Sequence, residues 1–360
     1  MVEPVADAKG VRPWAEADLA HFLKSGSDFA IVRRLPCHEK PQEVGQVLPL
    51  ADLENTLGPE RILVLDSSFN PPTKAHRQMA IEAVAHYGSH GTRLLLLLSV
   101  NNADKAAKPA AFPARWAMME LLARDLALYF WEQQEQADRQ RAAGWPKHEL
   151  SPWFGIDMAL TTLPYFHQKS EALAAAETHT FVPRWPNTDR RAQQVLLVGF
   201  DTLTRILDPR YYPPGRVAET LGPMFERATL RVTLRAGASA IDGWEQRRYV
   251  SAVRTGRDCK WTQWTWREKV VVAEETHRAL GAETDISSTR ARTAVAEQNW
   301  ALLATLVPPK IAQWIQEQEL YREESQGSST EGGQALHHPE GPTSQAEETR
   351  ASYTEAGQAP

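Results

Sequence analysis

Cysteine is scarce in this chain, which has only Cys37 and Cys259 among its 360 residues. Two cysteines are too few for a disulfide framework or a cysteine-rich zinc site, so we expect reduced thiols in an intracellular compartment. The most apolar segment, Leu94–Val100, is far shorter than the roughly 20 residues that cross a bilayer. The N-terminal MVEPVADAKG has acidic residues and no apolar stretch, unlike a signal peptide. We therefore expect a soluble protein without a membrane partner.

Several motifs of nucleotide and metal chemistry are also absent. The sequence has no Gly-Lys dipeptide, which excludes a Walker A loop, and no GxGxxG pattern of a conventional dinucleotide-binding fold. Neither His-Glu pair continues into a metalloprotease motif. The formal net charge of -5 argues against a nucleic-acid partner, because duplex binding usually needs a basic face.

Short apolar segments alternate with helical patterns along the middle of the chain. Arg61–Asp66, Leu94–Ser99 and Val195–Gly199 are typical of buried parallel strands. The remaining expected elements are strands at Leu230–Leu234 and Val270–Ala273, helices at Thr73–Tyr87, Ala114–Phe130, Ser288–Asn299 and Pro309–Tyr321, and either a strand or a short helix at Phe154–Leu163. This order predicts an α/β fold, a doubly wound, Rossmann-like, mostly parallel sheet with helices on both faces.

The composition divides the chain into three parts. Residues 1–60 predict an N-terminal helical extension packed on a main domain of residues 61–322. Within that domain, residues 236–267 are rich in charge and tryptophan and indicate an insertion near the edge of the sheet. Residues 323–360 contain almost no apolar side chains, so they cannot bury enough surface to offset their ordering entropy, and we expect a disordered tail.

The turn Asp66–His76 follows the first expected strand directly. Ligands of doubly wound sheets collect at the carboxyl ends of the strands, and a helix N-terminus there offers free N–H groups to an anion. Thr73 and His76 are three residues apart, so they share one helical face and can both hydrogen-bond a phosphate group. The alternative is a turn that begins a helix without any ligand, with a structural histidine.

A second polar segment, Ile286–Arg292, precedes the first of the two final helices. Ser287, Ser288 and Thr289 are good N-cap residues, and the simplest interpretation is a helix cap. Arg292 would project from the first turn, where hydroxyls, backbone donors and a guanidinium together could clamp a polyphosphate.

Both segments resemble motifs of one family. The sequence SSFNPPTKAH is similar to the GSFNPxTxxH loop of nicotinamide mononucleotide adenylyltransferases, within the nucleotidylyltransferase superfamily, and is closest to the divergent fungal branch. The sequence ISSTRAR matches that family's second motif, ISSTxxR, completely. Further similarity, including SVNNADK and LVPPKIAQWIQEQELY, extends the resemblance over about residues 61 to 321.

The resemblance implies a nucleotidylyltransferase fold and transfer of the adenylyl group of ATP to nicotinamide mononucleotide, which forms NAD and pyrophosphate. It implies Mg²⁺ held mainly by the ATP phosphates, no metal site of the protein itself, and a cytoplasmic or nuclear location. His76 and Arg292 are the implied catalytic residues. The implied ATP-binding residues are Ser68, Phe69, Thr73, His76, Lys105, Gly199, Asp201, Ser288, Thr289, Arg290 and Arg292, and the implied acceptor-binding residues are Trp153 and Arg235.

Alternatives remain open for several of these residues. Asp201 could be the N-cap of a helix beginning at Thr202, and Lys105, Trp153 and Arg235 could each be ordinary surface or core residues.

One position departs from the family loop, because Ser67 stands where the motif has glycine. Serine adopts positive φ only at a cost, so either the backbone there has ordinary dihedral angles or activity is reduced.

Two other functions compete with the implied one. The first is a sister nucleotidylyltransferase that acts on another phosphate acceptor. The second is a nucleotide-binding or ATP-hydrolysing scaffold that uses the tail and the Trp-rich insertion to bind partners. The tail could also serve a homo-oligomer.

Overall fold

The computed structural model describes residues 8–36, 48–49, 58–88, 91–100, 110–142, 155–181, 191–234, 243–256, 266–273 and 286–322. These residues belong to one compact unit, Met1–Arg322. The predicted tail, 323–360, lies outside the described residues.

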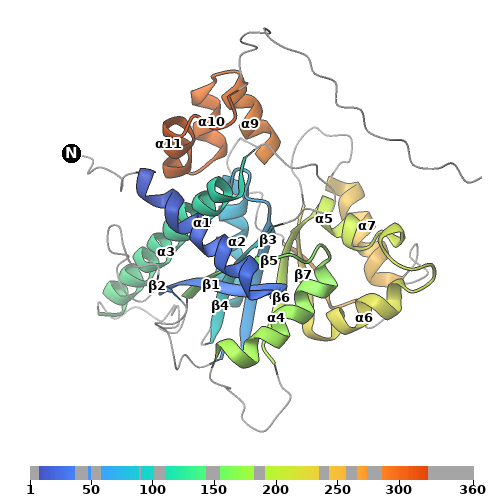
Figure 1. The fold of residues 1–360 in the computed structure, drawn as a ribbon. Helices are drawn as coiled ribbons and strands as arrows, with labels where there is room; N and C mark the ends of the chain where they lie inside the picture. The colour runs from blue at the N-terminus through green and yellow to red at the C-terminus, as the bar shows by residue number, and fades with distance from the viewer. Residues whose placement is uncertain are drawn as a thin grey trace, which may run out of the picture. The chain divides into compact units, whose positions relative to one another are not determined.

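Eight strands of the described chain form one sheet in the order β2-β1-β5-β4-β3-β6-β7-β8 (Figure 1). The six strands from β5 to β8 in that order are parallel, and β1 and β2 add an antiparallel edge. The bounds are β1 Phe29–Pro36, β2 Leu48–Pro49, β3 Arg61–Ser67, β4 Thr92–Ser99, β5 Gly155–Thr161, β6 Gln193–Gly199, β7 Ala228–Thr233 and β8 Val270–Ala273. The predicted α/β fold with a mostly parallel sheet is confirmed.

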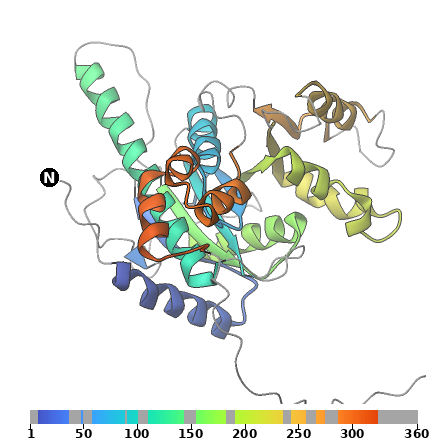
Figure 2. The ribbon, with the colours of Figure 1, turned by 90° about the horizontal axis from the view of Figure 1, so that it is seen from above.

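The central strands are apolar because both of their faces are covered. Every residue of β4 is buried. In β3, Leu63 and Leu65 pack into one core with helices α1 to α3, whereas Ile62 and Val64 pack into the other core with α4 to α7. Figure 2 shows the sheet between these helices. The bounds are α1 Ala8–Ser25, α2 Lys74–Tyr87, α3 Phe112–Ala142, α4 Phe166–Thr180, α5 Phe200–Ile206, α6 Val217–Arg227 and α7 Gly243–Thr255, with a short 3₁₀ helix at Pro209–Tyr211.

Three helices close the described chain: α9 Ser288–Ala296, α10 Trp300–Leu306 and α11 Pro309–Glu317. Sequence analysis predicted a single helix over Ser288–Asn299. The structure ends that helix at Ala296, because Gln298 takes a left-handed φ of 54° and Asn299 caps α10 by accepting a hydrogen bond from the Leu302 N–H. Figure 1 shows the three helices gathered at one end of the sheet.

The N-terminal segment adds a strand that the sequence pattern did not reveal. After α1, β1 pairs with β5 in antiparallel register. The segment at Phe154–Leu163, which fitted a strand or a short helix, forms β5. The helix α3 also extends beyond its predicted end at Phe130, where polar pairs spaced by four residues, such as Glu135 with Arg139, support a solvated helix.

A buried charge network joins the added strand to the sheet. Asp157 of β5 accepts hydrogen bonds from Arg34 of β1 and Arg93 of β4, with nitrogen–oxygen distances of 2.6 to 2.8 Å. Burial alone would raise the pKa of Asp157, but the two guanidinium groups outweigh it and the pKa is lowered. Gly155 leaves room for the Arg93 guanidinium, whose nearest nitrogen would lie 2.6 Å from an added Cβ.

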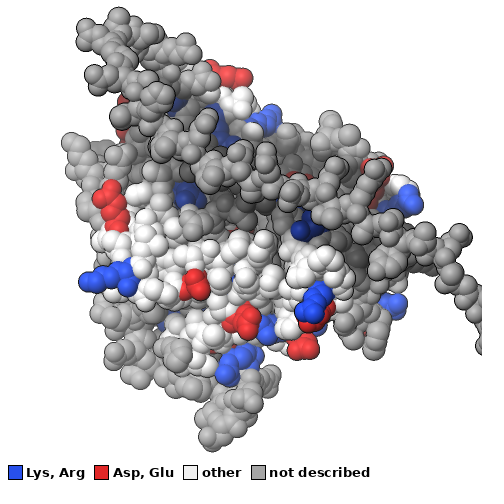
Figure 3. Space-filling view, turned by 45° about the vertical axis from the view of Figure 1, so that its right-hand side comes forward, with Lys and Arg blue, Asp and Glu red and all other residues white. Residues whose placement is uncertain are grey.

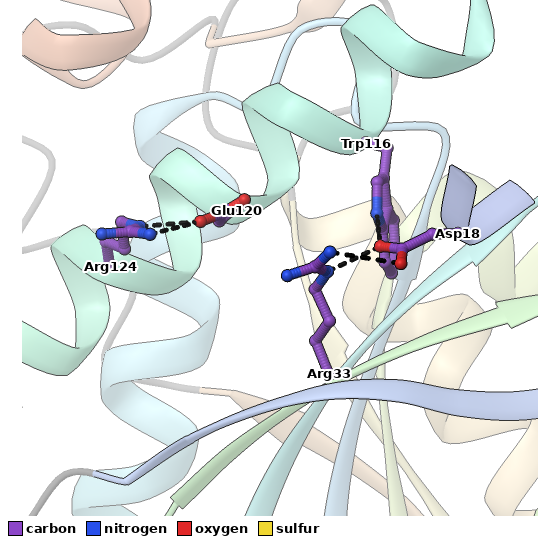
Figure 4. Close-up of polar contacts among 5 residues, drawn as sticks. All are labelled: Asp18, Arg33, Trp116, Glu120 and Arg124. Atoms are coloured by element: carbon purple, nitrogen blue, oxygen red, sulfur yellow. Dashed lines mark hydrogen bonds and ion pairs between the residues drawn. The ribbon is translucent and has the colours of Figure 1, made fainter. Parts of the chain in front are cut away.

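A second polar contact fixes α1. The Asp18 carboxylate accepts from Arg33 Nε at 2.6 Å and from Trp116 Nε1 at 2.8 Å (Figure 4). The Arg33 guanidinium also lies 4.1 Å from the centre of the Trp14 ring. Helix α1, strand β1 and helix α3 are thereby held together at a single carboxylate.

The described parts of the Trp-rich segment 236–267 take part in the fold. Helix α7 packs on β8, and Trp266 is buried, stacking on Phe225 with ring centres 4.3 Å apart. This segment therefore supplies core residues as well as surface.

The described surface carries charges of both signs. On the described part of the face shown in Figure 3, acidic and basic side chains lie interspersed among neutral residues. None of the described helices combines the length and apolar content needed to cross a membrane.

We predict that Asp157→Asn destabilises the protein by about 3–5 kcal/mol, because removing one partner leaves two guanidinium groups buried without their carboxylate. Urea denaturation at pH 7 measures this loss. Glu135→Gln is the control, since it breaks an exposed ion pair worth less than about 1 kcal/mol. Equal stability of the two variants would show that the buried network contributes little.

Candidate active site

The strand order of the sheet reverses between β3 and β6. From β3 the chain proceeds to β4 and β5 on one side, and β6, β7 and β8 follow on the other side. Leu65 pairs with Leu197, and Ser67 and Gly199 each lie two residues further along their strands. Ligands of open α/β sheets bind at the carboxyl ends of the strands beside such a switch point. The turn after Ser67 and the start of α5 after Gly199 both lie there.

His76 holds the turn between β3 and α2. Its Nδ1 accepts a hydrogen bond from the Thr73 backbone N–H at 3.0 Å and lies 2.8 Å from the Thr73 hydroxyl. Thr73 is the N-cap of α2 and is fully buried. Its hydroxyl lies against the His76 ring, and the phosphate contact of Thr73 stays a prediction.

These contacts show which nitrogen of the His76 ring carries the proton. A backbone N–H can only donate, so Nδ1 presents its lone pair and the proton is on Nε2. Nε2 lies 2.9 Å from the Ser67 hydroxyl oxygen and donates its hydrogen bond to that oxygen. Burial lowers the pKa of His76 to about 4. At neutral pH this histidine is an uncharged donor.

Ser67, which replaces the family glycine, has ordinary strand geometry, so the first of the two alternatives for this position holds. Among the described residues of this turn, the positive φ falls instead at Phe69, with a value of 45°. The Phe69 ring is completely buried and tilted against the His76 ring. A left-handed bulky residue costs about 1–3 kcal/mol, which packing of this kind can offset. Ser68, beside it, is partly exposed.

The second motif contacts the turn directly. Ser288 Oγ donates to the Pro71 carbonyl at 2.8 Å, and Arg292 Nη1 donates to the Asn70 carbonyl at 2.8 Å. Arg292 Nη2 also donates to the Thr289 hydroxyl. The cap of α9 is Ser287, whose Oγ accepts from the Arg290 N–H. Two segments more than 200 residues apart thus meet at the switch point.

Two supports of this turn were not predicted as site residues. Tyr321 donates its hydroxyl hydrogen to Asn70 Oδ1 at 2.7 Å, and burial raises the pKa of Tyr321. Lys169 of α4 forms a buried ion pair with Asp66, the residue before Ser67. Asn70 and Tyr321 lie inside the segments that carry the family resemblance, which was the only available signal. Nothing in the sequence around Lys169 pointed to its partner.

Gly199 and Asp201 lie where β6 passes into α5. Gly199 is the N-cap of α5, and a Cβ at this position would meet no atom within 4 Å. Asp201 is exposed in the first turn of that helix. The alternative that made Asp201 the cap of a helix beginning at Thr202 is wrong, because α5 begins at Phe200.

Three predicted residues cannot be placed in this site. Lys105, Trp153 and Arg235 lie outside the described residues. Arg290, from the second motif, is partly buried at the start of α9.

A curated protein of Schizosaccharomyces pombe named "Putative nicotinamide mononucleotide adenylyltransferase" is 28% identical to this chain over 307 residues, covering 84% of this chain and 95% of that protein. The predicted resemblance to the nicotinamide mononucleotide adenylyltransferase family is confirmed. No protein-family model matches the chain.

Solved structures of Plasmodium falciparum nicotinic acid mononucleotide adenylyltransferase are distant likenesses. The complex with APC has 13% identity and a TM-score of 0.39, and the complex with NaAD has 13% identity and a TM-score of 0.40. Each comparison covers 73% of this chain and 97% of the Plasmodium chain.

We predict that His76 makes stability sensitive to mild acid. Its pKa is about 4 in the folded protein and about 6.5 in an unfolded chain. The stability due to neutral His76 is therefore complete above pH 6.5 and is lost as the pH falls toward 4, by about 2 kcal/mol at pH 5.

The test compares denaturant midpoints at pH 7.5 and pH 5 for the wild type and His76→Gln. Glutamine at this position can still accept from the Thr73 N–H, as in a capping box, but it does not titrate. The wild type should lose more stability on acidification than the variant. Equal losses would mean that His76 titrates normally in the folded state.

Proposed function

We propose that the protein transfers the adenylyl group of ATP to nicotinamide mononucleotide and so forms NAD and pyrophosphate. The observation that carries this proposal is the contact between the two polar motifs, through Ser288 and Arg292, at the switch point of the sheet. The relative in Schizosaccharomyces pombe, whose name states this activity, supports it over most of the chain.

The reaction is a displacement at phosphorus. A phosphate oxygen of the acceptor attacks the α-phosphorus of ATP, the bond to the β-phosphate oxygen breaks, and pyrophosphate leaves. The attacking oxygen is already ionised at neutral pH, so the site needs no general base. Catalysis then rests on positioning and on donors aimed at the phosphate oxygens.

The donors have different roles in this proposal. The one N–H of His76, on Nε2, bonds to Ser67 Oγ in the structure, so in this proposal that bond is exchanged for one to a phosphate oxygen. The pKa of His76 is too low for it to supply positive charge. Arg292 supplies the charge, and a guanidinium can hold two phosphate oxygens at once. The N-terminus of α9 adds backbone N–H groups. The open space at Gly199 leaves room for the nucleoside beside β6.

Mg²⁺ enters this proposal as part of the Mg-ATP substrate. Within the described residues, no group of three or more His, Cys, Asp or Glu side chains is arranged to hold a metal ion. The acceptor would be held by residues such as Trp153 and Arg235, as the family resemblance implies.

Purified protein with Mg-ATP should release pyrophosphate and form NAD only when nicotinamide mononucleotide is added. A panel with nicotinic acid mononucleotide and pantetheine phosphate tests the acceptor, and mass spectrometry identifies the adenylylated product. Product from another acceptor alone would indicate a sister nucleotidylyltransferase. ADP release that is independent of any acceptor would favour a nucleotide-hydrolysing scaffold.

We predict that His76→Gln lowers turnover about 10²-fold, the usual loss for one donor to a developing charge, while the capping role of the residue is kept. Steady-state assays, with melting temperatures to verify folding, measure this. A folded His76→Gln enzyme with normal turnover would leave His76 with a capping role alone.

For Arg292, the matched pair is Arg292→Ala and Arg292→Lys. The alanine variant should lose about 10²-fold or more in turnover. The lysine variant keeps the charge and one donor toward Asn70, so it should recover part of the loss. If both variants equal the wild type, Arg292 serves only to hold the turn.

A further inference from the structure

A polar pocket lies beside α7, with a volume of about 430 Å³. Its described lining comes from four elements: His86 of α2, Arg231 of β7, Arg247, Val250, Ser251 and Arg254 of α7, and Val271 and Val272 of β8. Three arginines, a histidine and a serine thus face one space, and none of these described lining residues is acidic. Three valines supply an apolar wall.

Helix α7 contributes a single stripe to this pocket. Positions 247, 250, 251 and 254 follow the spacing of three and four residues that places side chains on one helical face. A stripe of arginines on a helix is by itself often a solvated surface. Here, however, the pocket is also lined by a strand, β7, which contributes a buried arginine.

That cation is Arg231, which is 4% exposed. Among the described residues its charged partner is Glu82 of α2, at 3.9 Å, too far for a hydrogen bond. The Glu82 carboxylate itself accepts from the Gln78 side chain at 2.9 Å. No hydrogen bond with a described residue engages the Arg231 guanidinium, and none of its nitrogens is among the fully enclosed atoms that lack a partner. Its donors therefore remain available to a molecule in the pocket.

The pocket is separate from the candidate active site. His76 is in the first turn of α2 and His86 is in its last turn. Ten residues of helix span about 15 Å. Residues of the two motifs that meet at the switch point are not among those that line the pocket.

We propose that this pocket binds a small phosphorylated metabolite of mononucleotide size. Guanidinium groups bind phosphate through paired hydrogen bonds, and Arg231, Arg247 and Arg254 would surround it from two walls. The valines would contact the apolar surface of the attached group, and Ser251 adds a hydroxyl. The volume lies within the range of small-molecule pockets, about 300–1,000 Å³.

Adenosine monophosphate is the probe, in calorimetric titrations of the full chain at constant ionic strength. The test variant is Arg247→Ala with Arg254→Ala, which removes the exposed arginines and leaves the buried Arg231 in place. The control is Arg210→Ala with Arg216→Ala, which removes two exposed arginines, one from the short 3₁₀ helix and one at the N-cap of α6. Both double variants change the net charge equally.

The wild type and the control should share a site for the probe that the test variant binds at least about tenfold more weakly. His76→Gln should leave that site unchanged, which separates this outcome from a failure of the proposed adenylyl transfer. Equal binding by test and control variants would overturn the proposal. So would inorganic phosphate binding as tightly as adenosine monophosphate, since the pocket would then take only the anion.

Discussion

The candidate site depends on one set of hydrogen bonds, in which the second motif donates to the backbone of the first. Asn70 and Pro71 come after the end of β3 at Ser67, beyond the residues that pair with β4 and β6, so the strand register supplies no partner for their carbonyls. Arg292 and Ser288 satisfy them, and Tyr321 holds the Asn70 side chain. The helices α9 to α11 are therefore required to shape a turn that begins more than 200 residues earlier, and the two motifs act as one structural unit.

Much of the fold could be predicted because its signals are local. Apolar runs such as Leu94–Ser99 are continuous, and a strand covered on both faces needs nothing else. The strand β1 was missed because Arg33 and Arg34 interrupt its apolar pattern, and their carboxylate partners, Asp18 and Asp157, are not visible from neighbouring residues. For the site, the motifs located the turn and α9. The neutral state of His76 and its bond to Ser67 could not be predicted, since both follow from burial and from the path of the turn.

The pocket lined by Arg231, Arg247 and Arg254 shows the same limit of sequence-based prediction. The helical spacing of Arg247, Val250, Ser251 and Arg254 can be read from the sequence. Arg231, by contrast, is one charged residue within an apolar strand, and its neighbours in the pocket come from α2 and β8. Only the sheet order, which places β7 beside β8 at the edge, brings the buried cation to the helical stripe.

The pairing of β1 with β5 also covers an edge of the parallel part of the sheet. All seven residues of β5 are buried, and without β1 the outer N–H and C=O groups of this strand would form an unpaired sheet edge. Such edges recruit strands from other molecules and promote aggregation. Helix α1 and strand β1 thus cover this edge, with contacts at Asp18 and Asp157. A chain lacking these two elements would expose the edge although both polar motifs were intact.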